Sequence, residues 1–476
     1  MVHFFLFLAC AFTVRAQTYV EVTQQEDISA ATLGFLIGSE GTYDVTNYKI
    51  TYNTTDTDGN PTVASGLIAL PTNRNVEYPV AVYMHGTVTG REQVPSRPQV
   101  PERILTDAVA SYGYVGLAPD YLGLGDNPGF HPYVHAESEA SAGRDLILAA
   151  RQWLTDQEIL FNDQLFLSGY SQGGHAVQAL HRDLQTNPAD DGLTVTAAGH
   201  LSGPYSISDV MRRATFEDTP ATLPGYIVYT YVSYDNVYGI YNGLNEVFKE
   251  PYLDVIERYD AEEIDGSRFN AELTTLLEDR DERLADMFQD SIREQLRTND
   301  PDSRIIQALR RNDTYEWAPE APTLIYYCTA DEQVPFENSI KADSAMRANG
   351  STTVTLTSGG DLSHTGCVEP AMLETIALFE SLATRRDVTS TGSPVALAHV
   401  GLAPNPVSAT ASLRFYGLDP GTYGYTLYDA AGRETQRGQL ANDGSLQLRQ
   451  TGRSGLHVLR LTLPDGRFTV RKVLLQ

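Results

Sequence analysis

Apolar and polar residues follow two different patterns along the first 385 residues. Residues 45–52 and 62–70 alternate between apolar and polar side chains, which is typical of strands with one buried face. Later runs are almost continuously apolar, as expected of strands that are buried on both faces. These runs are residues 78–84, 112–118, 164–167, 193–200, 323–328 and 352–356. Helical patterns separate them, so the sequence predicts an α/β fold with a mostly parallel, eight-stranded sheet.

A long insertion interrupts this alternation from about residue 205 to residue 320. It shows no strand pattern, and charged helical segments cover residues 269–279 and 283–297. Insertions of this length inside a compact domain often form lids, so we expect a helical cap above the site. The first part of the insertion is rich in tyrosine. These tyrosines either line a substrate pocket or pack the cap onto the core.

The pattern changes at both ends of the chain. Residues 385–394 are polar and lack periodicity, so a linker is expected over residues 387–400, and residues 401–476 form short alternating runs that predict a small β-sandwich. At the other end, the apolar residues 4–12 are too few to span a bilayer, and a small-residue cleavage site precedes Gln17. We therefore expect a signal peptide over residues 1–16, with a lipidated Cys10 as the alternative. No later segment predicts a transmembrane helix.

Composition adds two restrictions. The 476-residue chain has 34 basic and 61 acidic residues, a net charge of −27, which argues against nucleic acid as a partner. Signal removal would leave Cys328 and Cys367, and an even pair in an exported protein predicts a disulfide. Two buried free thiols are the alternative. The catalytic domain is then expected to occupy residues 17–386.

The strongest chemical motif is Gly169-Tyr170-Ser171-Gln172-Gly173, which stands between an apolar run and a helical pattern. A G-x-S-x-G at a strand-to-helix turn places the serine in a strained conformation that exposes its hydroxyl. Ser171 is therefore the predicted nucleophile. A plain glycine-rich turn is the alternative.

A serine nucleophile needs a base and a group that orients the base. His364 lies in a glycine-rich loop after the last predicted strand, and Asp331 follows the preceding strand. The order Ser171, Asp331, His364 is that of an α/β-hydrolase. Glu332 is the nearest substitute for Asp331.

Other histidines have less favourable positions. His131 and His135 precede the nucleophile and are expected to shape the pocket or pack beneath it, while His175 and His181 are expected to be structural. A metal site on Asp120, His131 and His135 is a minor alternative. The reaction itself needs no metal or organic cofactor.

Two backbone amides are needed to stabilise the oxyanion of the tetrahedral intermediate. The amide of Gln172 at the helix start is one candidate. The amide of Thr87, after the strand that ends in His85-Gly86, is the other.

Residues 40–385 resemble α/β-hydrolases of the secretory lipase (lipase A-like) family. The matching motifs are His85-Gly86, Pro119-Asp120-Tyr121-Leu122-Gly123-Leu124-Gly125, His131-Pro132-Tyr133, the motif around Ser171 and Asp331-Glu332-Gln333-Val334-Pro335. The resemblance implies hydrolysis of carboxylic esters through an acyl-enzyme, with Ser171, Asp331 and His364 as the triad.

The last 75 or so residues resemble the C-terminal sorting domain of type IX secretion. The matching segments are 403–407, 428–432, 455–461 and 471–475, with His457 where an aromatic residue is usual. The resemblance implies that the type IX machinery recognises residues 401–476. The protein would then pass through the periplasm of a Gram-negative bacterium and be secreted or held at the cell surface. An ordinary stalk or sugar-binding module is the alternative.

The sequence therefore predicts a secreted serine esterase or lipase acting on a small-molecule or lipid ester. One alternative is a serine peptidase of the same fold, in which acidic pairs of the cap (Glu262-Glu263 and Glu278-Asp279) hold a free amine. A carbohydrate acyl or feruloyl esterase and a non-catalytic surface-binding module are the others.

Overall fold

The computed structural model divides the chain into two compact units after Arg386. It describes residues 18–37, 41–189, 191–216 and 224–386 of the first unit, and also Asp387, the first residue of the second unit. In the C-terminal unit it describes residues 401–408, 411–416, 418, 423–429, 433–440, 444–449, 454–462 and 468–475. The expected signal peptide and most of the expected linker lie outside the described residues.

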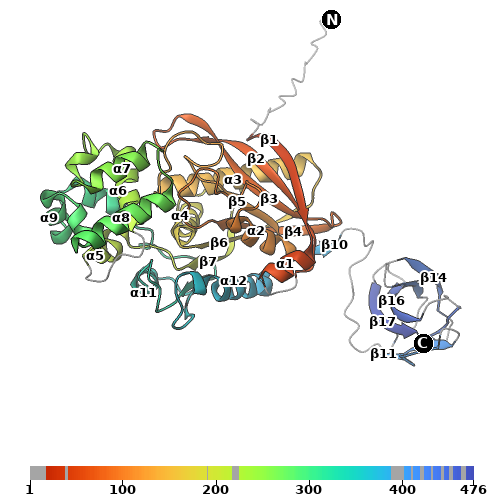
Figure 1. Cartoon of the computed structure of the whole chain (residues 1–476). Helices are drawn as coiled ribbons and strands as arrows, with labels where there is room; N and C mark the ends of the chain where they lie inside the picture. Colours follow the sequence, from red (N-terminus) through yellow and green to blue (C-terminus); the bar gives the residue numbers. More distant parts are fainter. Residues whose placement is uncertain are drawn as a thin grey trace, which may run out of the picture. The chain divides into compact units, whose positions relative to one another are not determined.

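A ten-stranded sheet forms the centre of the first unit (Figure 1). The strands lie in the order β1-β2-β3-β5-β4-β6-β7-β8-β9, and β10 pairs with β4. Neighbours from β5 to β9 along this order run parallel, whereas β1, β2 and β3 are antiparallel. Their bounds are β1 Tyr19–Ile28, β2 Val45–Thr55, β3 Pro61–Pro71, β4 Val76–Met84, β5 Val115–Pro119, β6 Phe161–Tyr170, β7 Val195–Leu201, β8 Thr323–Tyr327, β9 Val354–Ser358 and β10 Arg386–Asp387. The mixed α/β fold that the sequence predicts is confirmed.

The eight predicted strands correspond to β2–β9, and β1 and β10 are additional. Strand β1 has no apolar alternation because most of its side chains are exposed, among them Thr23, Gln24, Glu26 and Asp27. It pairs with β2 in antiparallel orientation, and none of its side chains is fully buried. A hydrophobic pattern could not reveal such a strand.

The continuous apolar runs arise because helices cover both faces of the sheet. On β4, Val80 and Val82 pack in one hydrophobic cluster with side chains of α3 and α4, whereas Ala81 and Tyr83 pack in a second cluster with α2 and α12. Every position of the strand from Tyr78 to Met84 is therefore buried. The described α-helices of the first unit outside the cap are α1 Ala30–Ile37, α2 Pro101–Ser111, α3 Ala136–Asp156, α4 Gln172–Thr186, α11 Glu337–Ala348 and α12 Val368–Leu382.

The insertion between β7 and β8 is helical and has a hydrophobic cluster of its own. We call residues 205–320 the cap, and its helices form the green group in Figure 1. They are the π-helix η1 Ile207–Met211, α5 Arg212–Ala214, α6 Pro224–Tyr238, α7 Tyr252–Asp260, α8 Gly266–Arg280, α9 Asp290–Thr298 and α10 Arg304–Arg311, with two short 3₁₀ turns, η2 Leu244–Glu246 and η3 Leu284–Met287. Tyr133 and Val134, from the loop before α3, belong to the same cluster, so the cap is packed onto that loop.

The C-terminal unit contains a three-stranded sheet (β11-β12-β15) and a four-stranded sheet (β14-β13-β16-β17), both antiparallel. One hydrophobic cluster includes side chains from both sheets, as in the small all-β sandwich that the sequence predicts. The strands are β11 Gly401–Ala403, β12 Ser412–Tyr416, β13 Gly424–Tyr428, β14 Glu434–Gln439, β15 Ser445–Gln447, β16 Gly455–Thr462 and β17 Phe468–Leu475. Among the described residues of both units, no helix has the length and apolar character needed to span a membrane.

Two histidines are buried between α4 and β7. His181 Nδ1 lies 3.3 Å from His200 Nε2, and the His181 ring packs against Trp317. Burial lowers the pKa of His181 to about 3, and burial with the neighbouring His181 lowers that of His200 well below its ordinary value. Both rings are therefore neutral in the folded protein at neutral pH, as expected of structural histidines.

These histidines make the first unit sensitive to acid. Below the ordinary histidine pKa of about 6.5 the unfolded chain binds protons that the folded chain does not bind, so stability falls as the pH falls from about 6.5 towards 3. We expect each histidine to contribute a loss of about 2 kcal/mol in the free energy of unfolding between pH 7 and pH 5. Urea unfolding followed by tryptophan fluorescence measures this, because both tryptophans, Trp153 and Trp317, lie in the first unit.

The variant His181→Gln separates this contribution from that of all other titrating groups. It should lose about 2 kcal/mol less than the wild type over the same pH interval. An equal loss in both proteins would contradict the assignment.

Candidate active site

Ser171 occupies the sharp turn between β6 and α4. Its backbone has φ 60° and ψ −123°, in the left-handed half of backbone space, and its N–H donates to the carbonyl of Leu201 on β7 at 3.0 Å. The start of α4 packs closely against β4: a Cβ on Gly173 would lie 1.9 Å from the carbonyl oxygen of Met84. Only glycine allows this approach, so the flanking glycine of the motif has a direct structural cause.

His364 and Asp331 lie in the loops that follow β9 and β8, and their side chains are in contact. The distance from His364 Nδ1 to Asp331 Oδ2 is 2.7 Å, and both side chains are almost completely buried. Asp331 Oδ1 accepts two backbone N–H groups, from Gln333 at 3.0 Å and Val334 at 2.9 Å. The carboxylate is thereby fixed, and it holds His364 with the proton on Nδ1 and the lone pair on Nε2.

Two further contacts hold the His364 loop, and the sequence did not reveal their roles. Glu332 Oε2 accepts the backbone N–H of His364 at 2.9 Å, so Glu332 supports the loop while Asp331 bonds the ring. Tyr170, the residue before Ser171, donates its hydroxyl to the carbonyl of His364 at 2.6 Å. Tyr170 thus connects the end of the nucleophile strand to the histidine loop.

The predicted disulfide between Cys328 and Cys367 is present, with the two Cα atoms 6.0 Å apart. Both residues are fully buried. Cys328 lies three residues before Asp331, and Cys367 lies three residues after His364. The disulfide therefore joins the two loops that carry the acid–histidine pair.

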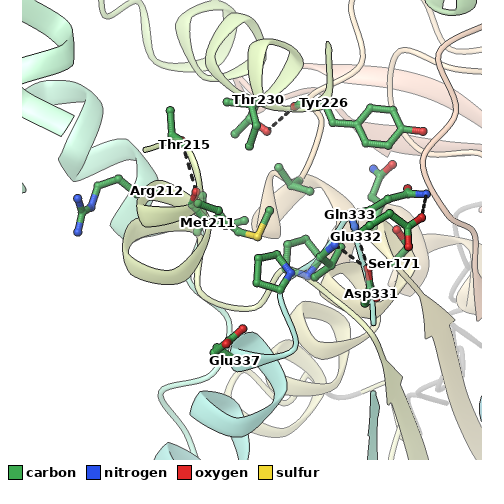
Figure 2. A pocket seen from close by; sticks show the side chains of 18 of the residues that line it. Ser171, Met211, Arg212, Thr215, Tyr226, Thr230, Asp331, Glu332, Gln333 and Glu337 are labelled. Atoms are coloured by element: carbon green, nitrogen blue, oxygen red, sulfur yellow. Dashed lines mark hydrogen bonds between the residues drawn. The ribbon is translucent and has the colours of Figure 1, made fainter. Parts of the chain in front are cut away.

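Ser171 and Asp331 line the same cavity, with a volume of about 420 Å³, beneath the cap (Figure 2). Among the described residues, no hydrogen bond joins Ser171 to the His364 ring. The hydrogen bond between a nucleophile and its base is often long before substrate binds. The structure therefore joins His364 to Asp331 directly and brings Ser171 to the same cavity.

The cap supplies most of the apolar wall of this cavity. Figure 2 shows cap residues such as Met211 and Tyr226 across the cavity from Ser171 and Asp331. The apolar and aromatic lining residues are Tyr133, Val134, Pro204, Ile207, Met211, Ala214, Tyr226, Ile227, Tyr231, Leu284, Leu309, Val334, Pro335 and Phe336. The volume is within the range of small-molecule pockets.

The cap tyrosines fulfil both of the roles that the sequence left open. Tyr226 and Tyr231 line the cavity, whereas Tyr229, Tyr234 and Tyr252 are buried in the cap's hydrophobic cluster. The acidic pairs that a peptidase could use to bind an amine are exposed, and none of them is among the described residues that line the cavity. Glu262 instead pairs with Arg91 at 3.4 Å.

The candidate oxyanion groups lie at the start of α4 and in the loop after β4. Gln172 is the first residue of α4 and lines the cavity. The Thr87 hydroxyl lies 2.9 Å from the hydroxyl of Tyr133, which also lines the cavity. The N–H of Gly86, the residue before Thr87, donates to Glu102 Oε2 at 3.3 Å. This hydrogen bond fixes the peptide group between His85 and Gly86.

The histidines and the aspartate of the alternative metal site bond other groups. Asp120 accepts hydrogen bonds from the Ser65 hydroxyl at 2.6 Å and the Ser96 N–H at 3.0 Å. His131 contacts Gln172, and His135 caps the start of α3. Across the described residues there is no cluster of three or more His, Cys, Asp or Glu side chains that could hold a metal ion.

No protein-family model and no curated protein matches this chain. Solved structures of other proteins do match it. A protein from Legionella pneumophila assigned as a hydrolase is 28% identical with a TM-score of 0.69, over 77% of this chain and 98% of that one. The rice cell wall degrading esterase LipA from Xanthomonas oryzae is 25% identical with a TM-score of 0.67, over 77% and 99%.

Candida antarctica lipase A in its closed state is 13% identical with a TM-score of 0.51, over 75% of this chain and 83% of that one. At this identity the likeness concerns the fold alone. These three similar structures are an esterase, a lipase and a protein assigned as a hydrolase, and the first unit shares their α/β-hydrolase fold.

Proposed function

We propose that the protein is a serine hydrolase that cleaves carboxylic esters through an acyl-enzyme on Ser171. The observation that carries this proposal is the 2.7 Å contact between His364 and Asp331 beside a cavity that Ser171 and Asp331 both line. The strained turn at Ser171 supports it, because such conformations persist where they serve a function. The similarity to an esterase that is 25% identical supports the same class of reaction.

In the first step Ser171 Oγ attacks the ester carbonyl while His364 Nε2 takes the hydroxyl proton. Asp331 keeps the Nδ1 proton of His364 in place and stabilises the imidazolium that forms. The amides of Gln172 and Thr87 stabilise the negative oxygen of the tetrahedral intermediate. His364 then donates the proton to the leaving alcohol, and water repeats the sequence to release the acid.

The acyl half of the ester occupies the cavity under the cap. Its wall is mainly apolar and aromatic, and the cap side offers Met211, Ile227 and Leu309 to an alkyl chain. Burial of methylene groups there adds about 0.8 kcal/mol each. Chains longer than acetyl should therefore react faster until the cavity is filled.

We also propose export of the protein. Residues 1–16 would direct it to the periplasm, and residues 401–476 would direct it through the type IX machinery to the outside or surface of a Gram-negative cell. The disulfide between Cys328 and Cys367 is compatible with an oxidising compartment.

Hydrolysis of p-nitrophenyl esters from acetyl to palmitoyl tests the proposed reaction. We expect the full chain to hydrolyse these esters faster at intermediate chain lengths than at acetyl, and Ser171→Ala to lose at least about 1000-fold in kcat. Ser168→Ala is a matched control, because Ser168 lies on β6 three residues before Ser171, is also buried, and its hydroxyl donates to the carbonyl of Val82 away from the cavity. Hydrolysis of aminoacyl substrates alone, or full activity in Ser171→Ala, would contradict the proposal, whereas hydrolysis of feruloyl esters alone would contradict only the preference for alkyl chains.

The disulfide should affect activity before it affects folding, because it joins the loop of Asp331, which lines the cavity, to the loop of His364. Both sulfurs are buried and react slowly with reductants, so the double variant Cys328→Ala/Cys367→Ala is the appropriate test. We expect kcat to fall at least about tenfold, since a small displacement of a catalytic group is sufficient for such a loss. Tryptophan fluorescence should stay native at 25 °C. Wild-type kcat in the double variant would show that the disulfide does not position the two loops.

A further inference from the structure

A chain of buried polar side chains begins at the residue after Ser171. Gln172 Nε2 lies 2.9 Å from Glu139 Oε1 and 2.9 Å from His131 Nε2. Glu139 Oε2 lies 2.6 Å from His175 Nδ1, and His175 Nε2 lies 2.8 Å from the carbonyl oxygen of Asn312. The side chains of Gln172, Glu139, His131 and His175 belong to residues that are at most 3% exposed.

The direction of each hydrogen bond in this chain follows from its neighbours. His131 Nδ1 lies 2.8 Å from the carbonyl of Leu122, so it carries the ring proton and Nε2 accepts from the Gln172 amide. Burial lowers the pKa of His131 to about 3, which keeps the ring neutral. The two ring nitrogens of His175 lie opposite oxygen atoms, one of Glu139 and one of Asn312. A proton must therefore lie between the two atoms of each pair.

The result is that two acceptors hold the Gln172 side chain from different elements. Glu139 lies on α3, and His131 lies in the loop before α3. Gln172 itself is the first residue of α4 and directly follows the strained turn at Ser171. A strained turn persists only when its surroundings fix it. The anchored Gln172 side chain is one of these surroundings.

Glu139 is an unusual residue to find in this position. A carboxylate that is fully buried is costly unless donors satisfy both oxygens. Here Gln172 satisfies one oxygen and His175 the other. His175 is in turn held by Asn312 at the end of the cap, so the chain runs from the cap to the nucleophile turn.

We propose that Glu139 and His131 are positioning residues for the Gln172 amide. By fixing the Gln172 side chain they fix the backbone N–H that stabilises the oxyanion. This inference rests on the proposed function, since it concerns the same reaction. Neither residue touches the reacting atoms, and both act through Gln172.

The variants Gln172→Met and Glu139→Met test the inference. Each keeps the Gln172 backbone amide and nearly the same side-chain volume. Gln172→Met removes both anchoring hydrogen bonds, whereas Glu139→Met removes the one to Glu139 together with the contact to His175. We expect kcat on a p-nitrophenyl ester to fall about 10- to 100-fold with KM within about twofold, because the oxyanion exists only after the attack. The affinity for a trifluoromethyl ketone, which forms a tetrahedral oxyanion on a serine, should fall by the same factor as kcat/KM.

Glu139→Gln should restore activity to within about threefold of the wild type. Its carbonyl can accept from Gln172, and its NH₂ can donate to Nδ1 of a neutral His175, so every hydrogen bond is kept without the charge. Gln178→Met is the matched control. Gln178 lies on the same helix, is fully buried and bonds His200 and Thr314 away from the turn. It should lose thermal stability but keep kcat.

Two results would overturn the inference. Wild-type kcat in Gln172→Met and Glu139→Met would show that the anchors do not position the amide. An equal loss of kcat in Gln178→Met would show only a general effect of damage to α4. A wild-type chain that hydrolyses no ester would instead contradict the proposed function, and the inference would fall with it.

Discussion

The strained backbone at Ser171 is the constraint on which the candidate site depends. The turn holds its unusual φ of 60° because Ser171 is bonded to Leu201 on the next strand and because α4 is pressed against β4. A methyl group at Gly173 would collide with the backbone of Met84. The close packing of β4 and α4 thus fixes the serine hydroxyl at the edge of the sheet where the loops after β8 and β9 begin.

The other groups of the site are held by different means. Asp331 and His364 lie on loops, which are less rigid than strands, and the loops are secured by the disulfide, by Glu332 and by the hydroxyl of Tyr170. The cap closes the cavity and also contacts the network behind the turn through Asn312. A chain of hydrogen bonds from Asn312 through His175 and Glu139 thus connects the cap to the nucleophile turn.

The sequence predicted those features that depend on local pattern. Burial on both faces gives β4 to β8 the apolar runs that the sequence shows, and the turn at Ser171 needs its glycines within two residues of the serine. The edge strand β1 was missed because its exposed side chains carry no pattern. Glu139 was missed because a glutamate is ordinarily exposed, and its partner His175 is 36 residues away. Contacts between distant residues have no local signal, so the roles of Tyr170 and Glu332 also required the structure.

The proposed reaction requires that Ser171 is the nucleophile. Mass spectrometry of the full chain after reaction with a fluorophosphonate tests this requirement most directly. We expect a single adduct, located on the peptide that contains Ser171, whose yield rises in proportion to the loss of ester hydrolysis. An adduct on another residue, or complete labelling of Ser171 with hydrolysis retained, would contradict it.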